Sequence, residues 1–164
     1  MDILDYLEAD QDALRALIVE FKIADEDSPH EAEAFTALVS AAKTQSEAKE
    51  QFYQWLAVGS QQIAEITDPL LEAISGAREV ERIIECCTNR ATWRSSVNIY
   101  CEMIENALAK ESSELLPAIF DSMSFGTRRS IGKKYRMARG FHDGHTKTRK
   151  DWQSVWARVI NQAG

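Results

Sequence analysis

The sequence predicts an all-α fold. The expected architecture is an up-down-up-down four-helix bundle over residues 2–122, followed by a basic helical extension over residues 123–164 that packs on the bundle. In four long segments, apolar residues recur at alternating spacings of three and four, which is the period of an amphipathic helix. The segments are joined by short connections and none alternates like a strand, so a helical bundle is favoured.

The first helix is expected from about residue 2 to residue 25, and Gln11 is the one polar member of its apolar stripe. The second helix is expected to begin where Ser28 caps it, Pro29 takes the first helical position and Glu31 closes a capping box. Gly59-Ser60 is expected to interrupt this helix.

The third helix is expected to start at Asp68-Pro69 and to end near Asn89. The fourth helix is expected from about Thr92 to Ser122. Pro117 should kink this helix or loosen its last turns, because proline removes a backbone hydrogen bond.

A carboxylate lies on the apolar stripe of the fourth helix. The stripe consists of Trp93, Val97, Tyr100, Ile104, Ala107 and Glu111. A buried carboxylate is costly unless it is protonated, hydrogen-bonded or paired with a cation. We expect Glu111 to accept a hydrogen bond from Gln11. A hydrogen bond from Thr44, an ion pair with Lys49 and protonation are the alternatives.

Charge is distributed unevenly along the chain. Residues 1–121 carry 24 acidic and 9 basic side chains, whereas residues 122–164 carry 2 and 10. The simplest interpretation is that the basic extension packs on the acidic bundle and lowers the repulsion within each part. Binding of nucleic acid or another anionic partner is the alternative. The candidate anion-binding residues are Arg128, Arg129, Lys133, Lys134, Arg136 and Arg139. The apolar face expected to dock the end of the extension consists of Trp152, Val155, Trp156 and Val159.

The composition favours a cytoplasmic protein of one domain. The chain has 164 residues, and its apolar content of 45 % is enough for a core. No run approaches the ~18 apolar residues of a membrane span, and the acidic N-terminus is unlike a signal peptide. Three cysteines, two of them adjacent within an expected helix, are typical of reduced thiols. His142-x-x-His145 lacks the second ligand pair of a zinc site and is interpreted as a surface turn.

Four short segments follow one another along the predicted helices. They are residues 2–11 (DILDYLEADQ), Phe52-Tyr53-x-x-Leu56, residues 78–84 (REVERII) and residues 111–117 (ESSELLP). In this order they resemble segments of hemerythrin-like (HHE cation-binding) domains, over roughly residues 2–120. The resemblance implies a four-helix bundle that binds two irons, or a similar metal pair, through histidine nitrogens and bridging carboxylates.

Carried over position by position, the resemblance implies that nearly every metal ligand is replaced. The positions that match the family's ligands are Gln11, Thr44 or Gln45, Ala48 or Lys49, Ala77, Ala107 and Glu111. The alternatives on the second helix arise because the pattern can be slid by one residue. Only Glu111 is of a ligand type, and one carboxylate cannot hold two irons. The chain therefore resembles a degenerate family member that has lost its metals.

These observations favour a non-enzymatic helical module without a cofactor, which binds an unknown small molecule or protein partner. Where the metals would lie, we expect either a repacked core or a small pocket. The candidate pocket consists of Gln11, Thr44, Ala77, Ala107 and Glu111. One alternative is a metal- or oxygen-binding protein with a non-standard ligand set. Another is binding of nucleic acid or an anionic partner through the basic extension. The sequence has no glycine-rich phosphate loop and no nucleophile elbow.

Overall fold

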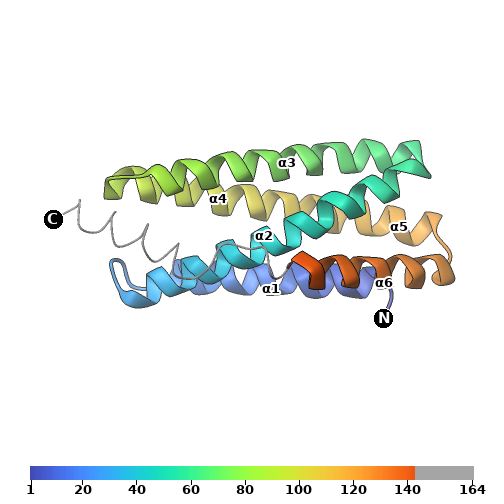
Figure 1. Ribbon diagram of the computed structural model, residues 1–164, viewed down its shortest axis with the longest axis horizontal. Coiled ribbons are helices and arrows are strands. Elements are labelled where there is room, and N and C mark those ends of the chain that lie inside the picture. Colours follow the sequence, from blue (N-terminus) through green and yellow to red (C-terminus); the bar gives the residue numbers. More distant parts are fainter. Residues whose placement is uncertain (143–164) are drawn as a thin grey trace.

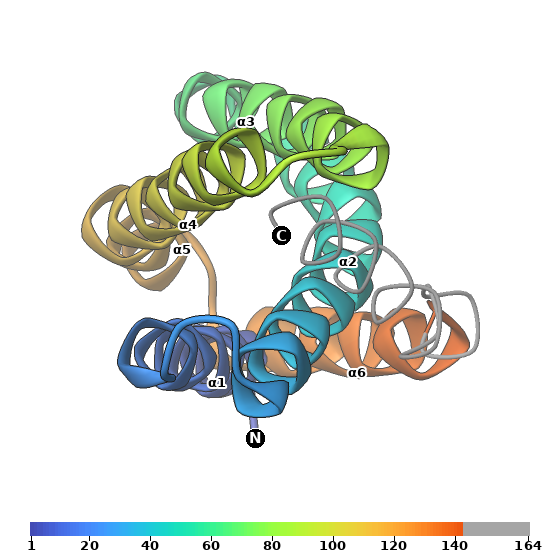
Figure 2. The ribbon, with the colours of Figure 1, turned by 90° about the vertical axis from the view of Figure 1, so that its left-hand side faces the viewer.

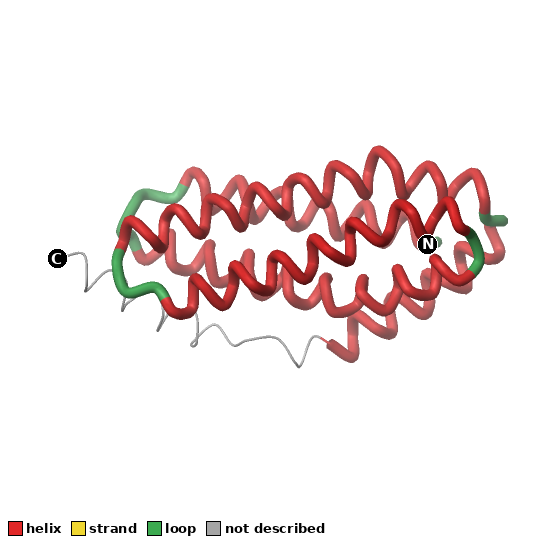
Figure 3. Tube along the Cα trace, turned by 90° about the horizontal axis from the view of Figure 1, so that it is seen from above, coloured by secondary structure: helices red, strands yellow, loops and turns green. Residues whose placement is uncertain are grey.

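The computed structural model describes residues 1–142, which form helices and no strand (Figure 3). The long helices of the bundle are α1 (Ile3–Ile23), α2 (Pro29–Val58), α3 (Gln61–Cys86) and α4 (Arg90–Lys110). A π-helical turn, η1 (Glu111–Leu115), joins α4 to α5 (Leu116–Ser122), and α6 (Phe125–His142) follows. The all-α class predicted from the sequence is confirmed.

The helices are arranged around a shared interior. Packed neighbours include α1 with α2, α2 with α3 and α3 with α4, while α6 contacts both α1 and α2. In Figure 1 the α1–α2 and α3–α4 connections lie at one end of the molecule and the α2–α3 connection lies at the other. Figure 2 looks along the molecule and shows α6 outside the ring formed by α1 to α4, beside α1 and α2.

Each of the four long helices begins with a side-chain cap. Asp2 Oδ1 accepts a hydrogen bond from Leu4 N at 2.7 Å, and Asp5 Oδ2 accepts one from Asp2 N at 2.7 Å. The caps of the next three helices are Ser28, Ser60 and Asn89. These side chains satisfy amide groups that have no partner within the first helical turn.

The start of α3 differs from the prediction. The helix begins at Gln61 instead of Asp68, because Ser60 Oγ accepts a hydrogen bond from Ile63 N at 3.3 Å directly after α2 ends. Pro69 therefore lies inside α3 and not at its start. Ile63 and Leu70 are buried before and after the proline. Their packing offsets the backbone hydrogen bond that the proline removes.

The core consists of two apolar clusters that follow one another along the helices. The first cluster is centred on Phe21, Phe35 and Trp93, whose rings pack edge to face or tilted. The second contains Phe52 of α2 and Tyr135 of α6, with ring centroids 5.3 Å apart. Gln11 of α1 and Glu111 of η1 lie, along their helices, between members of the two clusters.

The described part of the basic extension packs on the acidic first helix. Arg128 Nε lies 3.0 Å from Asp2 Oδ2, and Arg139 forms an ion pair with Asp10. Tyr135, between them on α6, is fully buried. α6 includes Gly140 and ends at His142. The apolar face predicted at Trp152, Val155, Trp156 and Val159 lies outside the described residues, as does most of the turn predicted from His142 to His145.

The contact between α6 and α1 depends on a glycine. A Cβ atom at Gly132 would lie 3.0 Å from Ile3 N and 3.1 Å from Asp2 C, which are backbone atoms.

We expect Gly132→Ala to lower the free energy of unfolding by about 1–3 kcal/mol, the usual cost of overpacking. A Cβ at Gly126 would meet nothing within 4 Å, so Gly126→Ala should raise stability by up to about 1 kcal/mol. Denaturant unfolding of both variants tests this, and equal changes would contradict the close contact.

Candidate functional site

Buried polar side chains meet where the two apolar clusters adjoin. We define the Glu111 network as Gln11 of α1, Lys49 and Tyr53 of α2, and Glu111 at the start of η1. All four residues are buried, and Glu111 is only 1 % exposed. Because a buried charge needs close partners, the contacts within this network decide whether the layer is stable.

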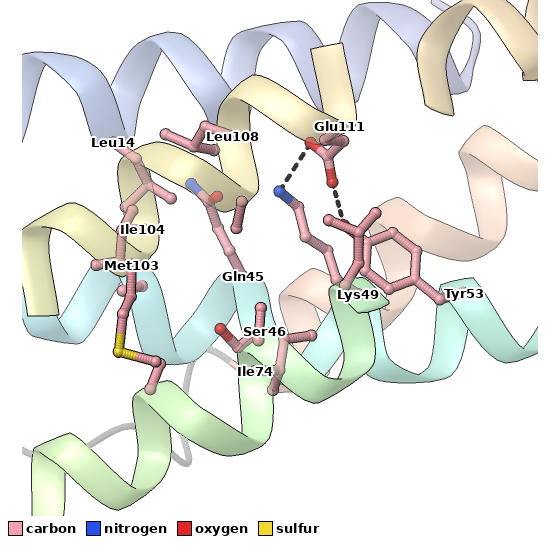
Figure 4. Close-up of a pocket in the computed structure, with 15 residues that line it drawn as sticks. Leu14, Gln45, Ser46, Lys49, Tyr53, Ile74, Met103, Ile104, Leu108 and Glu111 are labelled. Atoms are coloured by element: carbon pink, nitrogen blue, oxygen red, sulfur yellow. Dashed lines mark hydrogen bonds and ion pairs between the residues drawn. The ribbon is translucent and has the colours of Figure 1, made fainter. Parts of the chain in front are cut away.

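Three donors converge on the Glu111 carboxylate. Gln11 Nε2 donates to Glu111 Oε1 at 2.7 Å, and Lys49 Nζ lies 3.0 Å from the same oxygen. The Tyr53 hydroxyl donates to Oε2. Figure 4 shows Lys49 and Tyr53 reaching from α2 toward Glu111. The hydrogen bond expected from Gln11 is confirmed, and the ion pair with Lys49 exists together with it.

The surroundings fix the Gln11 and Tyr53 side chains. Gln11 Oε1 accepts a hydrogen bond from Ser112 Oγ at 2.6 Å, so both ends of this amide have a partner. Ser112 in turn accepts one from Arg15 at 2.9 Å. Burial and the neighbouring Glu111 carboxylate raise the pKa of Tyr53 well above 10.0. The Tyr53 hydroxyl therefore stays protonated and remains a donor at neutral pH.

A π-helical turn presents Glu111 to the interior. The helix predicted over residues 92–122, with a kink or loosened turns at Pro117, is divided: α4 ends at Lys110 and η1 occupies residues 111–115. Pro117, just beyond η1, has no N–H to donate to the Ser113 carbonyl. The wider turn accommodates this break in the hydrogen-bond ladder. Single π turns inside α-helices are frequent at functional sites.

A cavity of about 60 Å³ adjoins the Glu111 network. Its polar lining consists of Gln45, Ser46, Lys49, Tyr53 and Glu111. Its apolar lining comes from α1 to α4 and consists of Leu14, Ala42, Leu70, Ala73, Ile74, Ala77, Met103, Ile104, Ala107 and Leu108. Figure 4 shows Leu14, Met103, Ile104 and Leu108 on one side of this space and Lys49, Tyr53 and Glu111 on the other.

The structure distinguishes the two alignments left open on the second helix. Gln45 and Lys49 line the cavity, whereas Thr44 and Ala48 do not. Thr44 Oγ1 donates to the Ser40 carbonyl of its own helix at 3.0 Å, and Ala48 is part of the second apolar cluster. The candidate pocket was therefore wrong in including Thr44. Ala77, Ala107 and Glu111 do line the cavity. Gln11 does not line it, so its inclusion was wrong as well, although its amide donates to Glu111.

The residues at the cavity do not fit a pair of metal ions. In the lining, Glu111 is the sole residue of the type His, Cys, Asp or Glu, and the Lys49 ammonium lies 3.0 Å from its Oε1 atom. A cation at this carboxylate would be repelled by that ammonium. Among residues 1–142, no group of three such ligand residues is placed to hold a metal ion.

Three further buried carboxylates have partners that the helical stripes did not predict. The Asp10 carboxylate accepts a hydrogen bond from Tyr135 at 2.5 Å and pairs with Arg139. Asp10 precedes Gln11 by one position and lies beside the stripe, so periodicity gave no signal for this contact.

Glu31 is the second case. Ser28 Oγ accepts from Glu31 N at 3.1 Å, but the Glu31 carboxylate binds two arginines of α4 and not the Ser28 amide.

The third case is Glu81 of α3. Its Oε1 atom accepts a hydrogen bond from the Tyr100 hydroxyl at 2.9 Å, and Lys43 Nζ lies 3.6 Å from Oε2. Glu81 follows Ala77 by four positions, so the helical period could have placed it on the same face. This carboxylate lies beside the first apolar cluster and does not line the cavity.

The six candidate anion-binding residues fall into two groups. Arg128 and Arg139 turn toward α1 and pair with its carboxylates. The exposed members are Arg129, Lys133, Lys134 and Arg136. The neutralisation of acidic residues by α6 agrees with the simplest interpretation of the charge asymmetry, whereas the four exposed cations are available to an anionic partner.

Comparisons of the chain with protein-family models, with curated proteins and with solved structures find no match. The resemblance to hemerythrin-like domains therefore stays a prediction from the sequence. Within residues 1–142, no helix combines the length and the apolarity that crossing a bilayer requires.

We expect the Lys49–Glu111 pair to behave as one unit in unfolding experiments. Glu111→Gln should lower the free energy of unfolding by about 3–5 kcal/mol, because it leaves the Lys49 ammonium buried without its counter-ion. Adding Lys49→Met should recover most of that loss, since both charges are then removed. A double-mutant cycle by denaturant unfolding measures the coupling, and an unchanged stability of Glu111→Gln would rule the pair out.

Glu81 should give stability a separate pH dependence. Burial raises the pKa of this carboxyl above its ordinary value of 4.5, against the lowering effects of Tyr100 and Lys43. The folded state therefore holds a proton that the unfolded state has lost, so stability falls as pH rises from 4.5 through the folded pKa. We expect Glu81→Gln to gain stability relative to wild type between about pH 4 and pH 7. Unfolding free energies at both pH values test this, and a constant difference would contradict it.

Proposed function

We propose that this protein is a cytoplasmic, non-enzymatic, up-down-up-down bundle of the hemerythrin-like kind that binds a small molecule instead of metals. The observation that carries the proposal is the cavity. Several of the positions that match the metal ligands of hemerythrin-like domains meet there. Two of those positions hold alanine, Ala77 and Ala107. Replacing imidazole by a methyl group leaves space that neighbouring helices refill only in part.

The polar groups at the cavity support binding more than catalysis. Lys49 and Tyr53 each bond to Glu111, and Gln11 donates to the same carboxylate from outside the lining. The neutral Tyr53 hydroxyl and the ion-paired Glu111 carboxylate are thus held by mutual contacts. A general base needs a side chain that can reach a substrate proton, whereas Lys49 and Tyr53 are bonded to Glu111 and both oxygens of Glu111 are engaged.

The alternative of a metal site with non-standard ligands is disfavoured by Lys49. Its ammonium takes the place beside Glu111 Oε1 that a cation would need. A second candidate function is contact with nucleic acid or another anionic partner through α6. That candidate is favoured by Arg129, Lys133, Lys134 and Arg136, which share an exposed part of one helix.

A pair of matched variants on α4 tests the proposed site. Ala107 lines the cavity, whereas Ala109 is exposed on the same helix. We expect Ala107→Leu to fill the cavity, and Ala109→Leu to leave it open. Mass spectrometry should then find a small molecule released from purified wild type and from Ala109→Leu, and at least tenfold less from Ala107→Leu.

The same preparations decide between the alternatives. Equal recovery from Ala107→Leu and Ala109→Leu, or no released molecule from any of them, would contradict the proposed function. Elemental analysis showing stoichiometric iron would favour the metal-binding alternative. Circular dichroism and thermal unfolding serve as the control, because both variants must fold for the comparison to count.

A further inference from the structure

The Gln45 amide provides an unused acceptor at the cavity. Gln45 is 2 % exposed and lines the cavity. Its Nε2 atom donates to the Asp10 carbonyl at 3.0 Å, while its Oε1 atom is buried and has no hydrogen-bond partner among residues 1–142. Figure 4 shows this amide between Leu14 and Leu108, at the level of the cavity. Buried polar atoms without a partner are uncommon and costly in folded proteins.

The contact with Asp10 fixes which atom of the amide stays unpaired. Turning the amide over would bring Gln45 Oε1 against the Asp10 carbonyl oxygen, and two acceptors repel each other. The acceptor at the cavity therefore cannot exchange places with the donor. A bound group must bring a hydrogen-bond donor of its own in order to satisfy Gln45 Oε1.

The ion pair at the other side of the lining limits the charge of the bound group. Lys49 and Glu111 balance each other within 3.0 Å, so the polar lining is electrically neutral. A charged ligand would have to leave water without finding an unpaired counter-charge among these residues, which is costly. A neutral donor, such as a hydroxyl group, avoids this cost.

The size and the apolar lining limit the rest of the molecule. The cavity of about 60 Å³ is smaller than the ~150 Å³ of an engineered cavity that holds benzene. The wall beyond the polar groups is made of aliphatic side chains from all four long helices. A short aliphatic body with fewer non-hydrogen atoms than benzene matches this space.

We propose that the cavity binds a small neutral alcohol, whose hydroxyl group donates to Gln45 Oε1 and whose carbon atoms contact the aliphatic lining. This inference rests on the proposed function and adds the chemical class of the ligand. A water molecule can also donate to Gln45 Oε1, but it makes no apolar contacts. An alcohol satisfies both the acceptor and the aliphatic wall.

A pair of isosteric probes tests the role of the donor. 2-Propanol and acetone have nearly the same shape, but acetone has no hydrogen-bond donor. We expect 2-propanol to bind roughly tenfold more tightly than acetone, since acetone leaves Gln45 Oε1 unpaired. NMR titration of uniformly labelled protein measures both affinities, with the Gln45 side-chain amide and the Ala77 and Ala107 methyl groups as reporters. Protonated isopropylamine, the charged counterpart, should produce no saturable shift at these positions.

Two variants separate this inference from the proposed function. Gln45→Met keeps the approximate shape and removes the acceptor, so 2-propanol should lose its advantage over acetone. Ala107→Leu should abolish the binding of both probes, whereas Ala109→Leu should preserve it. If Gln45→Met does not fold, the comparison of the two probes on wild type still decides the role of the donor.

Equal affinities for 2-propanol and acetone in wild type, or tighter binding of acetone, would overturn the alcohol assignment and leave the cavity as a binding site. Tight binding of protonated isopropylamine would also overturn it. The absence of any saturable shift with both neutral probes would overturn it as well. In that case the proposed function is judged separately, by the small molecule released from wild type and from the two α4 variants.

Discussion

The ion pair between Lys49 and Glu111 is the interaction on which the middle of this bundle depends. Two charges are buried at a level where a helical bundle ordinarily has apolar side chains, and neither could remain there alone. Gln11 and Tyr53 supply further donors to the carboxylate, so the network is satisfied within the protein. The contacts join α1, α2 and η1, and they fix the position of these segments along one another.

Asp10 connects this layer to the outer helix. Its carboxylate binds Tyr135 and Arg139 of α6, while its backbone carbonyl accepts from Gln45. The acidic first helix is thus held to the basic α6 by residues next to the Glu111 network. Through Gln45, the same residue determines how one polar wall of the cavity is oriented. Asp10 therefore contributes both to the packing of α6 on α1 and to the orientation of Gln45 at the cavity.

The cavity itself follows from small side chains placed opposite a rigid polar layer. Ala73, Ala77 and Ala107 contribute little volume to the lining, and the Glu111 network cannot move into the remaining space without breaking its bonds. Apolar side chains alone could collapse around such a gap. A fixed ion pair prevents that collapse, which explains why space remains at the same level as the buried charges.

The sequence by itself determined the helical segments, the Ser28 cap of α2 and the stripe that places Glu111 in the interior. These features depend on local periodicity and on cap chemistry, which act within a few residues. Only the tertiary structure decided that Gln45 and Lys49, not Thr44 and Ala48, face the cavity. It also decided that η1 interrupts the last long helix, and that Asp10, Glu31 and Glu81 find partners on other helices. Those outcomes depend on contacts between residues far apart in the chain, such as Asp10 and Tyr135, and on the rotation of each helix against its neighbours, which no local pattern specifies.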